Sequence, residues 1–175
     1  MGSRKSETGV APPPDTTPPA DGFVPAHATR SATIHLHAPP DRVFPLFTPE
    51  GERLWVPGWL PRYLWPTDGA AQVGMTFLTE HEGRETTWMV ADFDPGRRAV
   101  YTRVTTGLSA VRVEVLCAPD GDGTAANIRY DYVGLTPAGN ASIEQITETR
   151  YAEWMDEWER AVNAYLATGF AAHHG

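Results

Sequence analysis

Apolar and polar residues alternate along much of the second half of the chain. The stretch SAVRVEVLCA (109–118) has a valine at every second position, with Arg112 and Glu114 between them, and AANIRYDYVGL (125–135) repeats the pattern. A period of two is typical of a β-strand with one buried and one solvated face. Four further stretches are predicted to be strands: SATIHLHAP (31–39), GMTFLTEH (74–81), ETTWMVADF (85–93) and RAVYTRVTT (98–106).

Short links separate the later strands, and each link contains glycine or proline: EGR, DPGR, TTG and PDGDG. Links of this length join antiparallel neighbours through tight turns. The middle of the chain is therefore predicted to be an antiparallel sheet with one covered face.

Two regions have helical spacing instead. In PPDRVFPLFTPEGERLWV (39–56), Pro45 and Pro49 interrupt the pattern, so we expect two short helices, the first capped by Asp41. From about 140 to 167, apolar residues recur every three or four positions. This predicts one long helix, with Ser142 and Gln145 at capping-box spacing, an earlier start possible at Thr136-Pro137, and a stop at Gly169.

These elements define an α+β class in which a curved antiparallel sheet of about six to seven strands wraps around a long C-terminal helix. The chain has 175 residues, 41% of them hydrophobic and 10% aromatic, which suits one domain with a sizeable core. Its net charge of -8 and the lack of a basic run argue against nucleic acid and anionic lipid as partners. No apolar run reaches the ~20 residues that span a bilayer.

Residues 1–27 are proline-rich and poor in aliphatic side chains, so we expect a disordered tail, with a partner-binding role as the alternative. The folded domain is predicted to cover residues 28–170, followed by a flexible end at 171–175.

Cys117 is the single cysteine, which excludes an internal disulfide and suits a reduced, cytoplasmic compartment. His35 and His37 make a weak ligand pair, so neither metal nor cofactor is expected.

The segment GERLWVPGWLP (51–61) places Trp55 and Trp59 four residues apart around a Pro-Gly bend. Such rings suit the wall or lid of a ligand cavity, and the alternative is that they close the end of the core. In the strand 74–81, His81 shares a face with Phe77, so it is a candidate base or ligand partner, or else an exposed strand-end histidine.

Buried tyrosines are the next candidates. Tyr130 and Tyr132 share the covered face of their strand, and their hydroxyl groups either orient a ligand or bond to backbone. Alternation along the predicted strand ETTWMVADF favours Met89 and Phe93 on the covered face of the sheet, which places Trp88 on the outer face. On the long helix the apolar stripe includes three candidates for contact with a ligand: Thr147, Tyr151 and Trp154.

The order of elements, with APPDRVFPLFT after the first strand, DFDPGRRAVY at a mid-sheet hairpin and a final tryptophan-bearing helix, resembles the START-like superfamily (SRPBCC). The resemblance covers about residues 28–169. It implies a deep apolar cavity between sheet and helix, used by members for lipids, sterols, hormones or polyketides. Relatives include polyketide cyclases and activators of a heat-shock ATPase.

Two functions remain open. One is binding of a hydrophobic or aromatic small molecule by the residues Trp55, Trp59, Phe77, Met89, Tyr130, Tyr132, Thr147, Tyr151 and Trp154. The other is a cyclase or dehydratase, in which His81, Tyr130 and Glu52 transfer protons. A buried ionisable group with a strongly shifted pKa would favour chemistry, and a purely apolar lining would favour binding. The sequence has few inward charges, so binding is preferred, whereas ligand identity and oligomeric state stay undetermined.

Overall fold

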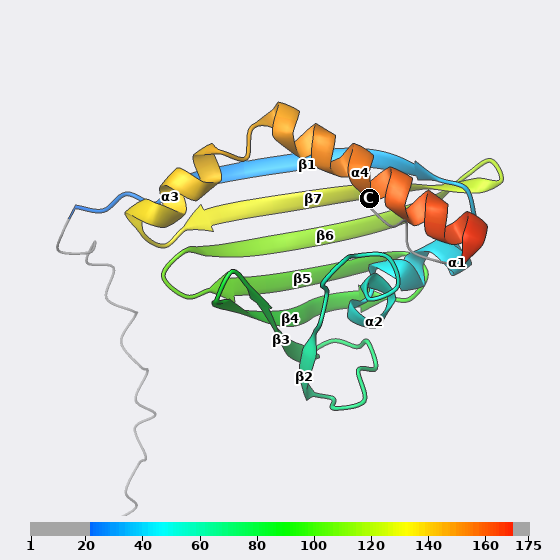
Figure 1. Ribbon diagram of the computed structural model, residues 1–175, viewed down its shortest axis with the longest axis horizontal. Coiled ribbons are helices and arrows are strands. Elements are labelled where there is room, and N and C mark those ends of the chain that lie inside the picture. Colours follow the sequence, from blue (N-terminus) through cyan, green and yellow to red (C-terminus); the bar gives the residue numbers. More distant parts are fainter. Residues whose placement is uncertain (1–21, 170–175) are drawn as a thin grey trace, which may run out of the picture.

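The computed structural model describes residues 22–169, in which a curved antiparallel sheet packs one face against helices (Figure 1). The seven strands lie in the order β1-β7-β6-β5-β4-β3-β2. Their bounds are β1 His27–Leu36, β2 Arg62–Trp65, β3 Thr76–His81, β4 Arg84–Asp94, β5 Arg98–Thr105, β6 Ser109–Asp120 and β7 Gly123–Gly134.

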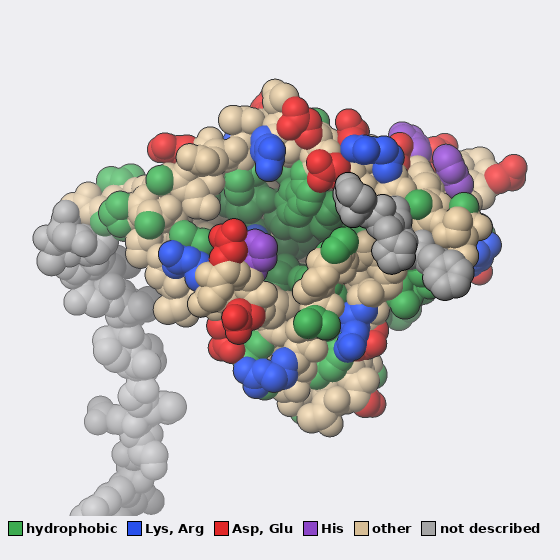
Figure 2. Space-filling view, in the orientation of Figure 1, with side chains coloured by type: hydrophobic (Ala, Val, Ile, Leu, Met, Phe, Trp, Pro, Cys, Tyr) green, Lys and Arg blue, Asp and Glu red, His purple; other side chains and the backbone are tan. Residues whose placement is uncertain are grey.

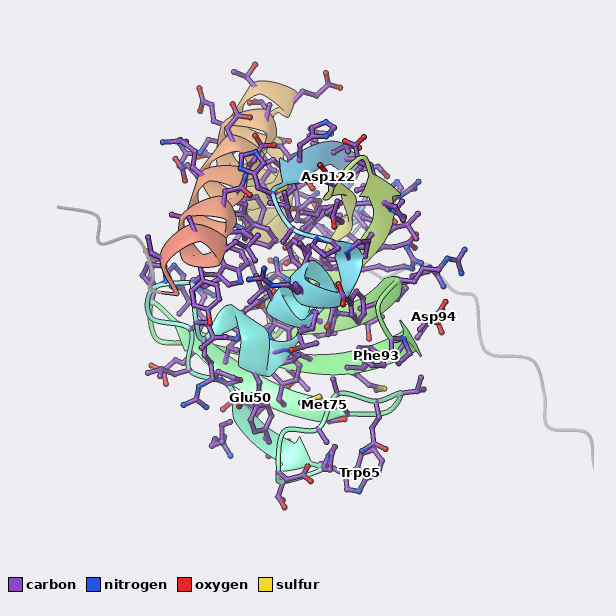
Figure 3. All side chains as sticks on the ribbon, turned by 90° about the vertical axis from the view of Figure 1, so that its right-hand side faces the viewer. Glu50, Trp65, Met75, Phe93, Asp94 and Asp122 are labelled. Atoms are coloured by element: carbon purple, nitrogen blue, oxygen red, sulfur yellow. The ribbon has the colours of Figure 1, made fainter. Side chains whose placement is uncertain are left out.

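All six neighbouring strand pairs are antiparallel, which confirms the hairpins predicted from the short links. Strand β2 was not predicted, because three of its four residues are exposed and no alternation marks it. It forms one edge of the sheet, and Figure 3 shows Trp65 at this edge. Trp65 is 53% exposed, whereas Met75, just before β3, is fully buried.

Three short helical turns follow β1: α1 (Pro40–Val43), the 3-10 turn η1 (Phe44–Phe47) and α2 (Pro49–Glu52). The two expected helices are therefore present, with η1 between them. Asp41 does not cap α1, because the capping position is Pro39 and Asp41 lies in the first turn. Thr48 caps α2, and its hydroxyl accepts a hydrogen bond from the Gly51 amide at 3.1 Å.

The C-terminal region contains two helices, α3 (Pro137–Glu144) and α4 (Glu148–Thr168), where one was predicted. Ser142 and Gln145 are not a cap. Thr136 begins α3 and Thr147 begins α4, each through a hydroxyl that accepts from a backbone amide three residues later. Between the helices, the Ile146 carbonyl accepts a hydrogen bond from Arg30 Nε at 2.7 Å. The predicted stop is confirmed, since Gly169 closes α4 at φ 72°.

The parity prediction for β4 is wrong at Met89 and Trp88. Met89 is 47% exposed, whereas Trp88 packs against the core on the inner face. The register between β4 and β5 shifts between Val90 and Asp92, so a β-bulge inserts one residue there. A bulge reverses face parity, which explains how Trp88 and Phe93 both point inward although they are five positions apart.

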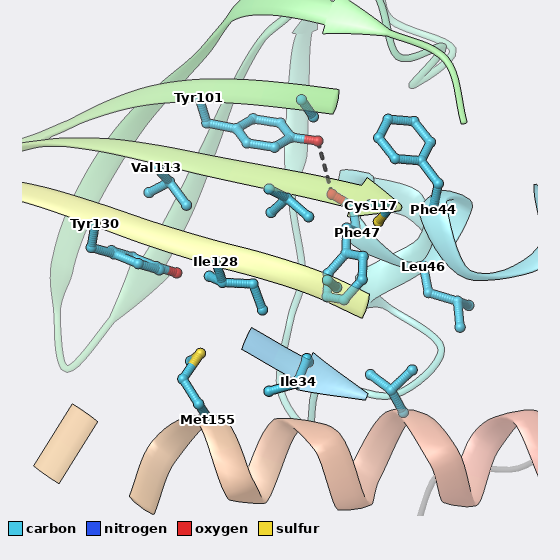
Figure 4. Close-up of a cluster of buried hydrophobic side chains, with 14 of the residues drawn as sticks. Ile34, Phe44, Leu46, Phe47, Tyr101, Val113, Cys117, Ile128, Tyr130 and Met155 are labelled. Carbon is cyan, nitrogen blue, oxygen red and sulfur yellow. Dashed lines mark hydrogen bonds between the residues drawn. The ribbon is translucent and has the colours of Figure 1, made fainter. Parts of the chain in front are cut away.

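The core fills the space between sheet and helices. Figure 4 shows side chains from β5, β6 and β7 meeting those of η1 and α4. The Tyr101 hydroxyl donates to the Phe47 carbonyl oxygen at 2.8 Å and joins the sheet to η1. Helix α4 also covers the β1 edge, where Glu159 and Asn163 accept hydrogen bonds from the backbone amides of His35 and His37. No helix within residues 22–169 combines the length and apolarity needed to cross a membrane.

Candidate functional site

A cavity of about 400 Å³ opens between the sheet, α4 and the loop that follows α2. Figure 2 shows its mouth as a hollow lined by hydrophobic side chains and bordered by charged ones. Pro57 and Leu60 form one side of the mouth, and Glu80 and His81 at the end of β3 form another. The volume lies in the range of small-molecule sites.

The wall of the cavity on the sheet side is a row of residues aligned across the strands. Phe77, Trp88 and Arg103 pair in register from β3 to β5. The rings of Phe77 and Trp88 stack at 5.6 Å with an interplanar angle of 7°. Trp59 from the opposite loop meets Trp88 edge-on at 5.7 Å, so three aromatic rings form one surface.

Glu52, the last residue of α2, lines this cavity from the helical side. Gly51 allows α2 to approach η1 closely, because a Cβ at this position would lie 1.9 Å from the Pro45 carbonyl oxygen. Within the described residues, the Glu52 carboxyl group takes part in no hydrogen bond and no ion pair. Burial raises its pKa from 4.5 to about 8, so it is mostly protonated at neutral pH.

Arg103 brings a positive charge to the same cavity from β5. Its guanidinium carbon lies 5.2 Å from the ring centroid of Trp88, a cation–π geometry. The Trp88 indole N–H donates to the Thr79 hydroxyl at 2.9 Å, which fixes the ring beneath the cation. Arg103 Nε is buried and has no hydrogen-bond partner.

Tyr130 on β7 is buried and also lines the cavity. Burial raises the pKa of its hydroxyl, and the nearby charge of Arg103 acts in the opposite direction. No described residue forms a hydrogen bond with this hydroxyl. Tyr101 lies two strands away, in register with Tyr130 through Val113, and its hydroxyl is bonded to the Phe47 carbonyl. An acid, a cation and a hydroxyl group of the cavity lining thus have no hydrogen-bond partner among the described residues: Glu52, Arg103 and Tyr130.

The structure brings six of the predicted site residues together around the cavity: Glu52, Trp59, Phe77, His81, Tyr130 and Trp154. His81 lies at the mouth with a side chain that is 91% exposed, as the strand-end alternative predicted. Trp59 donates its indole N–H to the Pro49 carbonyl at 2.8 Å, so the ring offers a ligand its apolar surface.

Five predicted residues lie elsewhere: Trp55, Met89, Tyr132, Thr147 and Tyr151. Trp55 is a core residue, whose indole N–H donates to the Leu46 carbonyl at 2.8 Å. Tyr151 is also in the core and donates to the Ile128 carbonyl at 2.8 Å.

The other three lie away from the cavity for local reasons. Tyr132 is buried behind Tyr130, with their rings stacked at 5.6 Å. Thr147 is exposed and serves as a helix cap. Met89 faces solvent because the bulge reverses the parity of the strand.

Several residues of the cavity were not predicted as site residues, among them Arg103 and Trp88. Arg103 lies two positions after Tyr101 in RAVYTRVTT and so shares its face of the strand, which made a charge at an inward position a visible signal. Trp88 was assigned to the wrong face, and the sequence carries no mark of the bulge. Within residues 22–169, no three histidine, cysteine or acidic side chains are grouped to hold a metal ion. Cys117 is buried, and burial raises its pKa to about 12, so it is unreactive as a thiolate.

Comparison with known proteins agrees with this architecture. A sequence family described as "Polyketide cyclase / dehydrase and lipid transport" matches residues 27–167. No curated protein matches the sequence.

Several solved structures are similar in fold. A Rhodobacter sphaeroides protein superposes with a TM-score of 0.59 at 18% identity, covering 82% of this chain and 98% of the other. DynU16, a protein of the dynemicin biosynthetic locus, gives 0.57 at 18% identity, and the match covers 83% of this chain and 49% of DynU16. A point mutant of Thalictrum flavum norcoclaurine synthase, in complex with a transition-state analogue, gives 0.57 at 14% identity, with 82% and 98% covered. At these identities the likeness shows the shared fold.

Proposed function

The chain belongs to the family described as polyketide cyclase/dehydrase and lipid transport, and from that premise we propose an enzymatic role for its cavity. The cavity binds an aromatic or other largely apolar small molecule and catalyses proton transfer on it. The reaction is of the cyclase or dehydratase type, on a polyketide-like substrate that carries a carbonyl group.

The observation that carries this proposal is Glu52. A carboxyl group in an aromatic cavity, with no partner among the described residues, would be costly if it only filled space. Its raised pKa, about 8, suits a group that exchanges a proton near neutral pH. A buried ionisable group with a strongly shifted pKa therefore favours chemistry over binding alone.

The chemistry follows from the protonation state. Protonated Glu52 donates its proton to the hydroxyl group of a bound β-hydroxy ketone, and the C–O bond breaks as water leaves. The carboxylate that remains then takes the proton from the carbon next to the carbonyl, and the electron pair of that C–H bond forms the new double bond. Glu52 ends protonated, so the cycle balances without a co-reactant. In a cyclisation, the enol form of the substrate attacks a second carbonyl carbon, and Glu52 protonates that carbonyl oxygen as the carbon–carbon bond forms. The carboxylate that remains takes the O–H proton of the attacking enol, so Glu52 again ends protonated.

Simple binding is the second candidate, because aromatic side chains cover most of the cavity. Trp59, Phe77 and Trp88 present flat apolar surfaces that suit an aromatic ligand. This role requires no proton transfer by Glu52.

Exchange of α-hydrogens for deuterium tests the proposal. The probe is 1-phenylpropan-2-one in D2O, followed by proton NMR at pD 7. We expect the protein to exchange these hydrogens faster than buffer does, and Glu52→Gln to lower the catalysed rate about a hundredfold. Glu153→Gln, which removes an exposed carboxylate on α4, is the control and should match the unaltered protein. Equal rates for Glu52→Gln and the unaltered protein would contradict the role of Glu52. Binding of the ketone without any exchange would favour the binding function.

A further inference from the structure

Arg103 differs from the other half-buried arginines of the sheet. Arg98 and Arg112 form ion pairs with carboxylates on neighbouring strands, and the more exposed Arg129 forms one with Asp131 on its own strand. Arg30 donates to the carbonyl oxygens of Ile146 and Thr29. Arg103 forms no ion pair or hydrogen bond with any residue in the range 22–169, and its Nε is buried.

The buried Nε–H group of Arg103 therefore lacks an acceptor among the described residues. Buried polar groups are nearly always hydrogen-bonded, and an unsatisfied one is costly. Cation–π contact with Trp88 holds Arg103 in place, but it supplies no acceptor for the guanidinium N–H groups. The acceptor is therefore expected from whatever occupies the cavity.

We propose that the cavity takes an aromatic carboxylic acid, whose carboxylate is bound by Arg103 and the hydroxyl of Tyr130. Its ring lies against Trp59, Phe77 and Trp88. This inference rests on the proposed function, since it names the class of molecule that the same cavity holds.

The donors favour a carboxylate over a phosphate. The planar guanidinium presents paired N–H groups that match the two oxygens of a carboxylate. Two other hydroxyl groups of the cavity are oriented by bonds within the protein, since Thr79 accepts from Trp88 and Thr86 pairs with Thr105. One cation and one hydroxyl suffice for a single negative charge, whereas a phosphate dianion usually requires more donors.

Glu52 is compatible with such a ligand. Because burial keeps this carboxyl group mostly protonated at neutral pH, it does not repel a bound carboxylate. The ligand therefore has its anionic end near β5 and β7, and its reacting atoms near α2.

Matched ligands test the proposal directly. The probes are 2-naphthoate and 2-naphthamide, which share a ring system but differ in charge, with binding at pH 7 followed by quenching of tryptophan fluorescence. We expect naphthoate to bind at least about tenfold more tightly than naphthamide. Arg103→Gln should weaken naphthoate binding about tenfold and leave naphthamide binding within about twofold.

Two further variants control for charge and folding. Arg84→Gln removes an exposed arginine at the β3–β4 turn and should bind both probes as the unaltered protein does. Arg103→Lys keeps the charge without the paired N–H groups and should give an intermediate loss, with thermal unfolding recorded for each variant.

The outcomes separate the two proposals. Equal affinity for the two probes in the unaltered protein, or an equal loss of both in Arg103→Gln, would overturn the carboxylate site while leaving a ligand cavity intact. Binding of neither probe would overturn both proposals. A preference for naphthoate that survives in Glu52→Gln, together with absent deuterium exchange, would support the carboxylate site and refute the catalytic role.

Discussion

Glu52 and Arg103, both within the described part of the chain, line one cavity and form no ion pair with each other. An ion pair would lower the pKa of the carboxyl group, whereas burial raises it to about 8. The two groups are thus separate: a neutral acid on the helical side and a free cation on the sheet. This separation underlies both proposals.

The raised pKa of Glu52 predicts how stability depends on pH. The folded state binds this proton up to about pH 8, whereas the unfolded carboxyl group releases it near 4.5. The free energy of unfolding should therefore fall as pH rises from about 4.5 to about 8 and level off above that. In Glu52→Gln this part of the pH dependence should disappear, so that at pH 8.5 the variant is more stable than the unaltered protein by about 1–3 kcal/mol. Urea unfolding at pH 5 and pH 8.5 measures both effects.

Glu153→Gln is the control for that experiment, because its carboxylate is exposed on α4. Its pH dependence should follow that of the unaltered protein. A Glu52→Gln variant with an unchanged slope between pH 5 and pH 8.5 would show that the carboxyl group is ionised in the folded state.

The two tryptophans of the 51–61 segment should respond differently to removal. Trp55→Ala leaves a hole in the core beside Phe47 and Trp158, and we expect a loss of about 3–5 kcal/mol in urea unfolding. Trp59→Ala should cost less stability and weaken the binding of 2-naphthamide by about tenfold, because its ring faces the cavity. A large stability loss with unchanged affinity for Trp59→Ala would place that ring in the core instead.

Gly51 should be intolerant of a side chain. A Cβ there would lie 1.9 Å from the Pro45 carbonyl oxygen, so η1 and α2 would have to move apart. We expect Gly51→Ala to lower the free energy of unfolding by about 1–3 kcal/mol or more and to displace Glu52 from the cavity. Gly58→Ala makes a useful comparison, since nothing lies within 4 Å of a Cβ there and only its φ of 73° opposes the change.

Much of the fold could be predicted from local sequence patterns, namely alternation of apolar and polar residues and glycine-containing links. Alternation and short glycine-containing links define β3 to β7, because each of these strands has one buried face. The break before α4 was not predictable from periodicity. It depends on the Thr147 cap and on Arg30, whose partner Ile146 is 116 residues away in sequence.

The candidate site, like the fold, was predicted only in part. Glu52, Trp59 and Phe77 were identified from residue type and position, and they do line the cavity. Whether a given aromatic residue reaches the cavity or stays in the core depends on long-range packing. Trp55 and Trp59 show this, since the same residue type four positions apart has opposite surroundings.

The bulge in β4 predicts opposite responses at two adjacent residues. Met89→Thr should change the free energy of unfolding by no more than about 0.5 kcal/mol, because the side chain is largely solvated. Val90→Thr should cost about 1–3 kcal/mol, because it places a hydroxyl group in the core. Chemical denaturation of the two variants measures the difference, and a reversed order would contradict the register.

Removal of residues 1–21 tests the predicted domain boundary, which lies partly outside the described residues. The melting temperature should stay nearly unchanged, because strands β1 to β7 and helices α1 to α4 all lie within residues 22–169. Residues 24–26 should be kept, since Asn140 bonds to the Val24 carbonyl and the Ala26 amide. A large drop in melting temperature would mean that the removed segment packs on the domain.

The bulge also has an evolutionary consequence. Ala91 is the inserted residue, so its deletion would restore regular pairing with β5 while Trp88 and Phe93 both kept their inward faces. One extra residue between Met89 and Val90, paired without a new bulge, would instead turn the first half of the strand over. A flexible thioether would then replace the indole beneath Arg103, and the cation would lose its aromatic support. In proteins built on this sheet, ligand preference can thus change through the gain of a single residue as well as through substitution.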